Sequence, residues 1–181
     1  MVVLRRMVDA IDRLNFFVGK AAAWLIFLAV VVSASNAISR KAFRLSSNAM
    51  LELQWYLFGT VVMLVAAWVL QRNEHVRIDI LSNKLSARTR HWIDIACHVL
   101  MLAPFAALMT WLSYPYLHRS FVRGEVSLSA GGLIIWPMRA VIVIGFALLL
   151  LQVIAIVVRK ILDGPPPRDE PPAPDVWDTL R

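Results

Sequence analysis

Four long apolar runs constrain this chain more than any other feature. They cover residues 16–38, 49–70, 93–117 and 133–158 of the 181-residue sequence. A helix needs about 20 residues, at about 1.5 Å each, to cross about 30 Å of hydrocarbon, so each run is long enough to span a membrane. A transmembrane barrel would instead show alternating segments of about ten residues. The sequence therefore predicts an all-α integral membrane protein with four transmembrane helices.

The remaining segments are too short for a second folded domain. We expect a basic N-terminus at residues 1–14, a four-helix membrane domain at 15–160 and a proline-rich tail at 161–181. Hydrophobic residues make up 59% of the chain and charged residues 17%, which is too apolar for a soluble domain of this size. The tail holds six of the nine prolines and cannot bury enough apolar surface to fold alone, so we expect it to be mobile.

Lysine and arginine are distributed unevenly about the spans. If the N-terminus is cytoplasmic, the segments on that side carry 13 of these residues and the segments on the other side carry 6. Membrane proteins concentrate lysine and arginine on the cytoplasmic side. We therefore expect both termini to be cytoplasmic. The net charge of +7 then reflects orientation and contact with anionic lipid, not binding of nucleic acid.

The connection at residues 71–92 is too apolar to be an ordinary loop. Val76, Ile80 and Leu81 can share one face of a helix, with most of the charged residues elsewhere. This pattern favours a short amphipathic helix lying in the membrane interface after the second span. The alternation of polar and apolar residues also fits a strand.

Few residues suggest cofactor or metal chemistry. His91, Asp94 and His98 share one helical face, but an interfacial histidine and an acid near a helix N-terminus explain them equally well, and no fourth ligand is evident. His98 and His118 would lie about 30 Å apart, on opposite membrane sides, and could not share a haem. A transport path usually needs charged groups in mid-membrane, and no span has one there. We therefore expect no metal, no cofactor and no catalytic residues.

Five short motifs occur in a fixed order among the spans. They are Glu52-Leu53-Gln54-Trp55-Tyr56-Leu57-Phe58, Leu70-Gln71-Arg72-Asn73-Glu74-His75-Val76-Arg77-Ile78-Asp79, Pro104-Phe105, Gly124-Glu125-Val126-Ser127 and Trp136-Pro137. Together they resemble the small membrane subunit, of the DctQ type, of tripartite ATP-independent periplasmic (TRAP) transporters. The resemblance covers roughly residues 15–160, and the segment from His75 to Asp79 is its most specific part.

The resemblance implies a bacterial inner-membrane complex that imports organic acids, such as C4-dicarboxylates or sialic acid, together with sodium. A large multi-span subunit would carry the substrate and ion sites, and a periplasmic solute-binding protein would deliver the solute. This chain would be an accessory scaffold subunit without enzymatic activity.

The same resemblance suggests residues for contacts within and between subunits. We expect Glu52, Trp55 and Tyr56 to face the outer part of the helices, with Glu52 in a polar contact to the large subunit or within the chain.

A second group would act on the cytoplasmic side. His75, Arg77 and Asp79 would tie the amphipathic helix to neighbouring loops, where arginine can make bidentate bonds.

On the periplasmic side, Glu125 and Ser127 would lie where a docked binding protein could touch them.

Two other functions stay open. A membrane anchor subunit of a redox enzyme would need paired histidines within the spans. A small self-assembling four-helix transporter or channel would need a polar path through the membrane.

Overall fold

The computed structural model describes residues 2–44, 47–72 and 86–166, and most of them are helical. The helices are α1 (Val2–Phe43), α2 (Asn48–Gln71), α4 (Ala87–Cys97), the π-helical turn η1 (His98–Leu102), α5 (Ala103–Arg123) and α6 (Trp136–Asp163). Because α4, η1 and α5 follow one another without a break, the described chain forms four rods, each long and apolar enough to cross a membrane. The predicted fold class, an all-α membrane protein with four spanning helices, is confirmed.

The helices extend beyond most of the expected spans. The 42 residues of α1 give a length of about 63 Å, so residues 2–14, expected as a separate basic segment, continue the first helix. The fourth helix begins at Trp136, three residues later than expected, because residues 133–135 belong to the hairpin that precedes it. It continues to Asp163, into the segment expected as tail. The expected amphipathic helix and the residues after 166 lie outside the described ranges.

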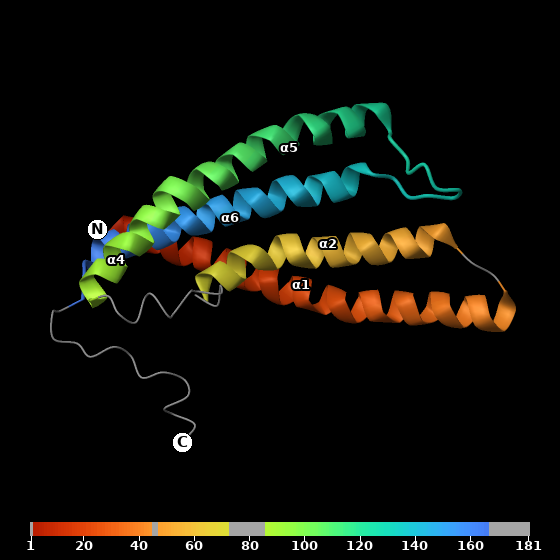
Figure 1. Ribbon diagram of the computed structural model, residues 1–181, viewed down its shortest axis with the longest axis horizontal. Helices are drawn as coiled ribbons and strands as arrows, with labels where there is room; N and C mark the ends of the chain where they lie inside the picture. Colours follow the sequence, from red (N-terminus) through yellow and green to blue (C-terminus); the bar gives the residue numbers. More distant parts are fainter. Residues whose placement is uncertain (1, 45–46, 73–85, 167–181) are drawn as a thin grey trace, which may run out of the picture.

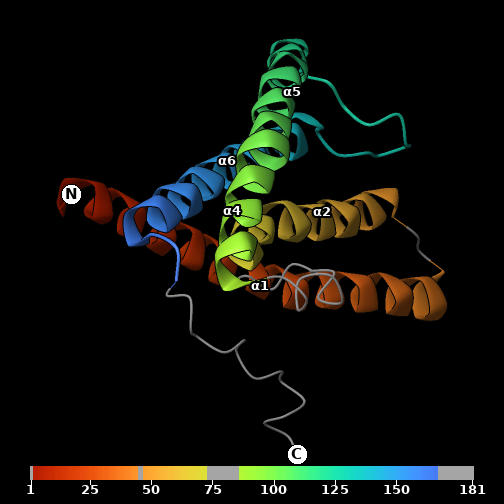
Figure 2. The same cartoon turned by 60° about the vertical axis from the view of Figure 1, so that its left-hand side comes forward.

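The rods run up and down, with α6 at the centre of the packing. α6 contacts α1, α2 and α5, whereas α5 packs mainly on α6 and stands apart from the pair formed by α1 and α2 (Figures 1 and 2). The end of α1, the start of α2 and the connection at residues 124–135 lie at one end, which we call the hairpin end (Figure 1). The N-terminus, α4 and the end of α6 lie at the other, which we call the terminal end (Figure 1).

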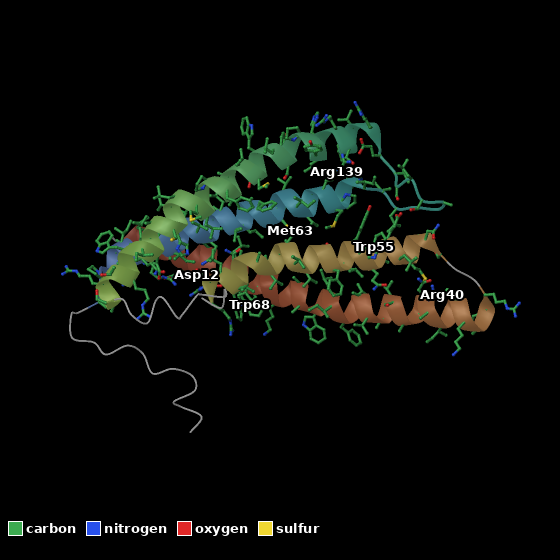
Figure 3. All side chains as sticks on the ribbon, viewed as in Figure 1. Asp12, Arg40, Trp55, Met63, Trp68 and Arg139 are labelled. Atoms are coloured by element: carbon green, nitrogen blue, oxygen red, sulfur yellow. The ribbon has the colours of Figure 1, made fainter. Side chains whose placement is uncertain are left out.

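Small residues allow α2 to approach both of its neighbours. A Cβ atom on Gly19 would lie 2.7 Å from Cβ of Trp68, and one on Gly145 would lie 2.9 Å from the carbonyl oxygen of Met63. Figure 3 shows Met63 and Trp68 along α2. Close contact at small residues is the usual way in which membrane helices pack, since lipid supplies no hydrophobic force between them. Large apolar side chains such as Trp111 are exposed and can face lipid.

The third rod changes its winding before a proline. Pro104 has no N–H to donate, and the preceding turn, η1, is π-helical. A proline and a π-helical turn are both known causes of helix bending, and the rod curves along its length in Figure 1. As a result α4 reaches the end of α6, where Nζ of Lys160 lies 2.7 Å from the Asp94 carboxylate.

Candidate functional site: a hairpin clamped by the second helix

The connection between α5 and α6 is an ordered hairpin. Gly124 ends α5 in the left-handed conformation, with φ of 58°, which glycine adopts without steric cost. Val126 and Ile134 then form an antiparallel bridge. The N–H of Ser127 donates to the carbonyl of Leu133 over 2.9 Å, which closes the two arms. The loop therefore has a defined backbone shape.

Glu52, near the start of α2, holds this hairpin. Its carboxylate accepts a hydrogen bond from the hydroxyl of Ser127 and another, of 2.8 Å, from the backbone N–H of Leu133. Glu52 is only 6% exposed, so a charged group that would be costly to bury alone is satisfied by donors from the hairpin. Asn48, one turn earlier, donates from its side chain to the carbonyl of Ala130 over 3.3 Å. Helix α2 therefore forms hydrogen bonds with both arms of the hairpin and with its turn.

A second charged contact ties the hairpin to α6. One guanidinium nitrogen of Arg139 lies 2.8 Å from the Glu125 carboxylate, and the same nitrogen donates to the carbonyl of Tyr116 over 3.0 Å. Tyr56 of α2 lies within electrostatic reach of both Glu52 and Arg139. Side chains from α2, the hairpin and α6, with one backbone carbonyl of α5, therefore meet in one polar cluster, near the position of Arg139 in Figure 3.

The cluster brings together four of the residues singled out in the sequence: Glu52, Tyr56, Glu125 and Ser127. Glu52 makes its described polar contacts within the chain. The side chains of Glu125 and Ser127, expected to be available to a binding protein, also have partners within the chain. Trp55 is 69% exposed, a side chain available for contact with lipid or another subunit.

The three residues expected on the cytoplasmic side, His75, Arg77 and Asp79, lie outside the described ranges. Two residues of the candidate metal face, Asp94 and His98, have other partners in the structure. The Asp94 carboxylate pairs with Lys160, and a ring nitrogen of His98 lies 2.6 Å from the backbone carbonyl of Asp94. Within residues 2–44, 47–72 and 86–166, no group of three or more histidine, cysteine or acidic side chains is placed to hold a metal ion.

A buried polar network at the terminal end was missed by the sequence reasoning. Gln152 of α6 is fully buried; it accepts from the Asn15 side chain over 2.6 Å and donates to the Asp12 carboxylate over 2.8 Å. Asp12 also forms an ion pair with Arg159, which lies two turns after Gln152 in α6. At the end of α6, a guanidinium nitrogen of Arg5 lies 3.0 Å from the carboxylate of Asp163 and adds a further contact between α1 and α6.

One signal in the sequence points to this network. Gln152 is the only amide or charged residue between Arg139 and Arg159, and it stands seven residues, or two helical turns, before Arg159. A lone amide in a membrane span usually faces another helix, because it needs a hydrogen-bond partner there. Its partners, Asp12 and Asn15, lie before the apolar core of the first run and gave no such signal.

These observations define a class: a small multi-pass helical membrane protein in which two groups of polar side chains hold its own helices and one hairpin together. Comparison with known families is more specific. Residues 28–163 match the family of DctQ components of the tripartite ATP-independent periplasmic transporters, and the chain belongs to that family. It is a small subunit of a TRAP transporter, a transport component and not an enzyme. A search of curated proteins found no match.

Proposed function

We propose that this chain supports sodium-coupled import of organic acids across the bacterial inner membrane. It would do so with a large membrane subunit that binds the solute and a periplasmic protein that delivers it. The family match over residues 28–163 carries the proposal, since that range includes the clamped hairpin and most of the four spanning rods. The excess of basic residues on one side supports cytoplasmic termini, which would place the hairpin in the periplasm.

The role that fits these features is that of a fixed scaffold. Glu52, Asp12, Asn15 and Gln152, the buried polar side chains with hydrogen bonds, bond to other parts of this chain. Such bonds, between helices and from α2 to the hairpin, stabilise one arrangement, whereas a moving transport element needs polar groups that can exchange partners. Movement of solute would then occur in the large subunit, with this chain bracing it.

Contacts with the large subunit would use side chains that this chain leaves available. Trp55 is exposed near the hairpin end of α2, as Figure 3 shows, and offers a large apolar surface. On the cytoplasmic side, His75, Arg77 and Asp79 remain our candidates, because arginine and carboxylate pairs give directional contacts. Glu125 and Ser127 would serve the binding protein by fixing the shape of the hairpin, and they could also contact it directly.

The test is copurification of the large subunit with an affinity-tagged form of this chain, encoded together with its neighbouring transport genes. We expect the native chain to retain the large subunit, and Arg77→Ala or Asp79→Ala to reduce the yield and the uptake of solute together. Arg88→Ala is the matched control, because Arg88 is exposed in α4, outside the motif. Native chain that retains no large multi-span partner would contradict the proposed function. Full retention and uptake in both motif variants would contradict only the role of the motif.

A further inference from the structure

The hairpin end is strongly basic on its exposed surface. The exposed basic residues there are Arg40, Lys41, Arg44, Arg119 and Arg123. Within the described part of the chain, no carboxylate lies within ion-pair distance of any of them. The acids of the clamp, Glu52 and Glu125, are engaged with Ser127, Leu133 and Arg139 and do not neutralise this surface.

Several of these charges stand clear of the hydrocarbon. Arg44 lies six residues after the first apolar run ends at Ile38, and Arg123 lies six residues after the third ends at Leu117. Six residues at the helical rise correspond to about 9 Å, and all of these residues except Arg44 are helical. The headgroup layer on each side of a bilayer is about 5–8 Å thick. Arg44 and Arg123 can therefore reach the water beyond the lipid headgroups, where a soluble protein could meet them.

The turn of the hairpin adds an apolar group to this basic surface. Leu128 is fully exposed, and Val126 is 52% exposed. The clamp from Glu52 and Asn48 fixes the backbone on which Leu128 stands. In Figure 1 the hairpin projects along the length of the molecule, beyond the adjoining ends of α5 and α6. An apolar side chain on a fixed loop, flanked by charge, has the form of an anchor for a pocket in another protein.

We propose that the hairpin end docks an acidic face of a soluble protein, with Leu128 in an apolar pocket of that face and Arg44 and Arg123 opposite its carboxylates. The inference rests on the proposed function, in which this partner is the periplasmic solute-binding protein. Lysine and arginine are disfavoured on the periplasmic side of membrane proteins, so a cluster there needs a reason, and an acidic partner supplies one. Charges at the rim of such a contact act mainly on the rate and salt dependence of association.

The experiment uses the complete complex in liposomes and measures the initial rate of solute uptake against the concentration of solute-loaded binding protein. The variants are Arg123→Glu, Arg44→Glu and Leu128→Ser. Arg123→Lys keeps the charge, and Arg88→Glu reverses an exposed charge at the terminal end. We expect each reversal at the hairpin end to raise the half-saturating concentration of binding protein about threefold or more, and both together about tenfold.

The maximal rate should stay near that of the native complex, and copurification of the large subunit should be unchanged. Arg123→Lys and Arg88→Glu should behave like the native chain, and raised salt should weaken the native complex more than the double reversal. Unchanged half-saturation in both Arg123→Glu and Leu128→Ser would overturn the docking surface and leave the proposed function intact. An effect that follows the fraction of anionic lipid, and not the binding protein, would assign these cations to lipid and also overturn it. Native complex whose uptake ignores the binding protein would instead contradict the proposed function.

Discussion

Replacing Gln152 by methionine tests whether the buried polar network stabilises the folded chain. Gln152→Met keeps nearly the same shape and removes an amide from the fourth membrane span. If that amide only faced lipid, its removal would stabilise the protein, because burying a polar group without a partner is costly. Gln152 is fully buried and bonded to Asn15 and Asp12, so we expect the opposite sign.

The size of the effect follows from the bonds that are lost. Hydrogen bonds between membrane helices contribute about 0.6 kcal/mol each on average, which gives about 1.2 kcal/mol for two. The Oδ1 atom of Asn15 already lacks a partner among the described residues, and the variant removes the partner of its Nδ2 atom as well. Leaving that buried group unsatisfied adds about 1 kcal/mol. The total, about 2 kcal/mol, is about a thirtyfold change in the folding equilibrium.

The assay is reversible unfolding of the purified chain in mixed micelles, with helix content followed as denaturing detergent is added. Ile154→Met is the control, since Ile154 is 48% exposed on the same helix. Asn15→Leu combined with Gln152→Met should recover part of the lost stability, because it removes the unsatisfied amide. A Gln152→Met protein as stable as the native one, or more stable, would refute the network's contribution.

Three further changes test other contacts. Glu52→Gln should loosen the hairpin, because it replaces one of the two acceptor oxygens by an amide nitrogen that only donates. Hydrogen exchange at Leu133 should accelerate several-fold, and unchanged exchange would contradict the clamp. Gly145→Val should lower the free energy of unfolding by about 1–3 kcal/mol in the same assay, since it places atoms against the α2 backbone. An unchanged free energy would contradict the close approach of α2 and α6. Asp94→Asn and Lys160→Met should each lower the free energy of unfolding by about 0.5 kcal/mol or less, and the double variant should be no less stable than either single variant. Additive losses would argue against direct pairing of the two side chains.

The spanning rods were predictable because crossing a membrane sets a minimum length that an apolar run reveals directly. Their ends were less predictable. The basic residues before the first run gave no apolar signal, yet they continue α1, in which Asp12 and Asn15 find partners on α6. Likewise the start of the fourth helix depends on the hairpin, whose returning arm takes residues 133–135.

The candidate site was predictable in its members but not in its pairing. Glu52 stood out as the lone charge in an apolar run, and Ser127 as part of a recognisable motif. They are separated by 75 positions, and local periodicity carries no information on which distant group an acid will meet. Arg139, near the start of the fourth span, joined the site only once the fold placed it beside Glu125.

The bracing role of this chain can be measured as uptake of organic acid by liposomes that contain this chain alone, the large subunit with the binding protein, or all three, under an inward sodium gradient. We expect sodium-dependent uptake in the complete mixture and none with this chain alone, with a marked loss when this chain is omitted. Sodium-driven uptake by this chain alone, or undiminished uptake without it, would contradict its role as a bracing subunit.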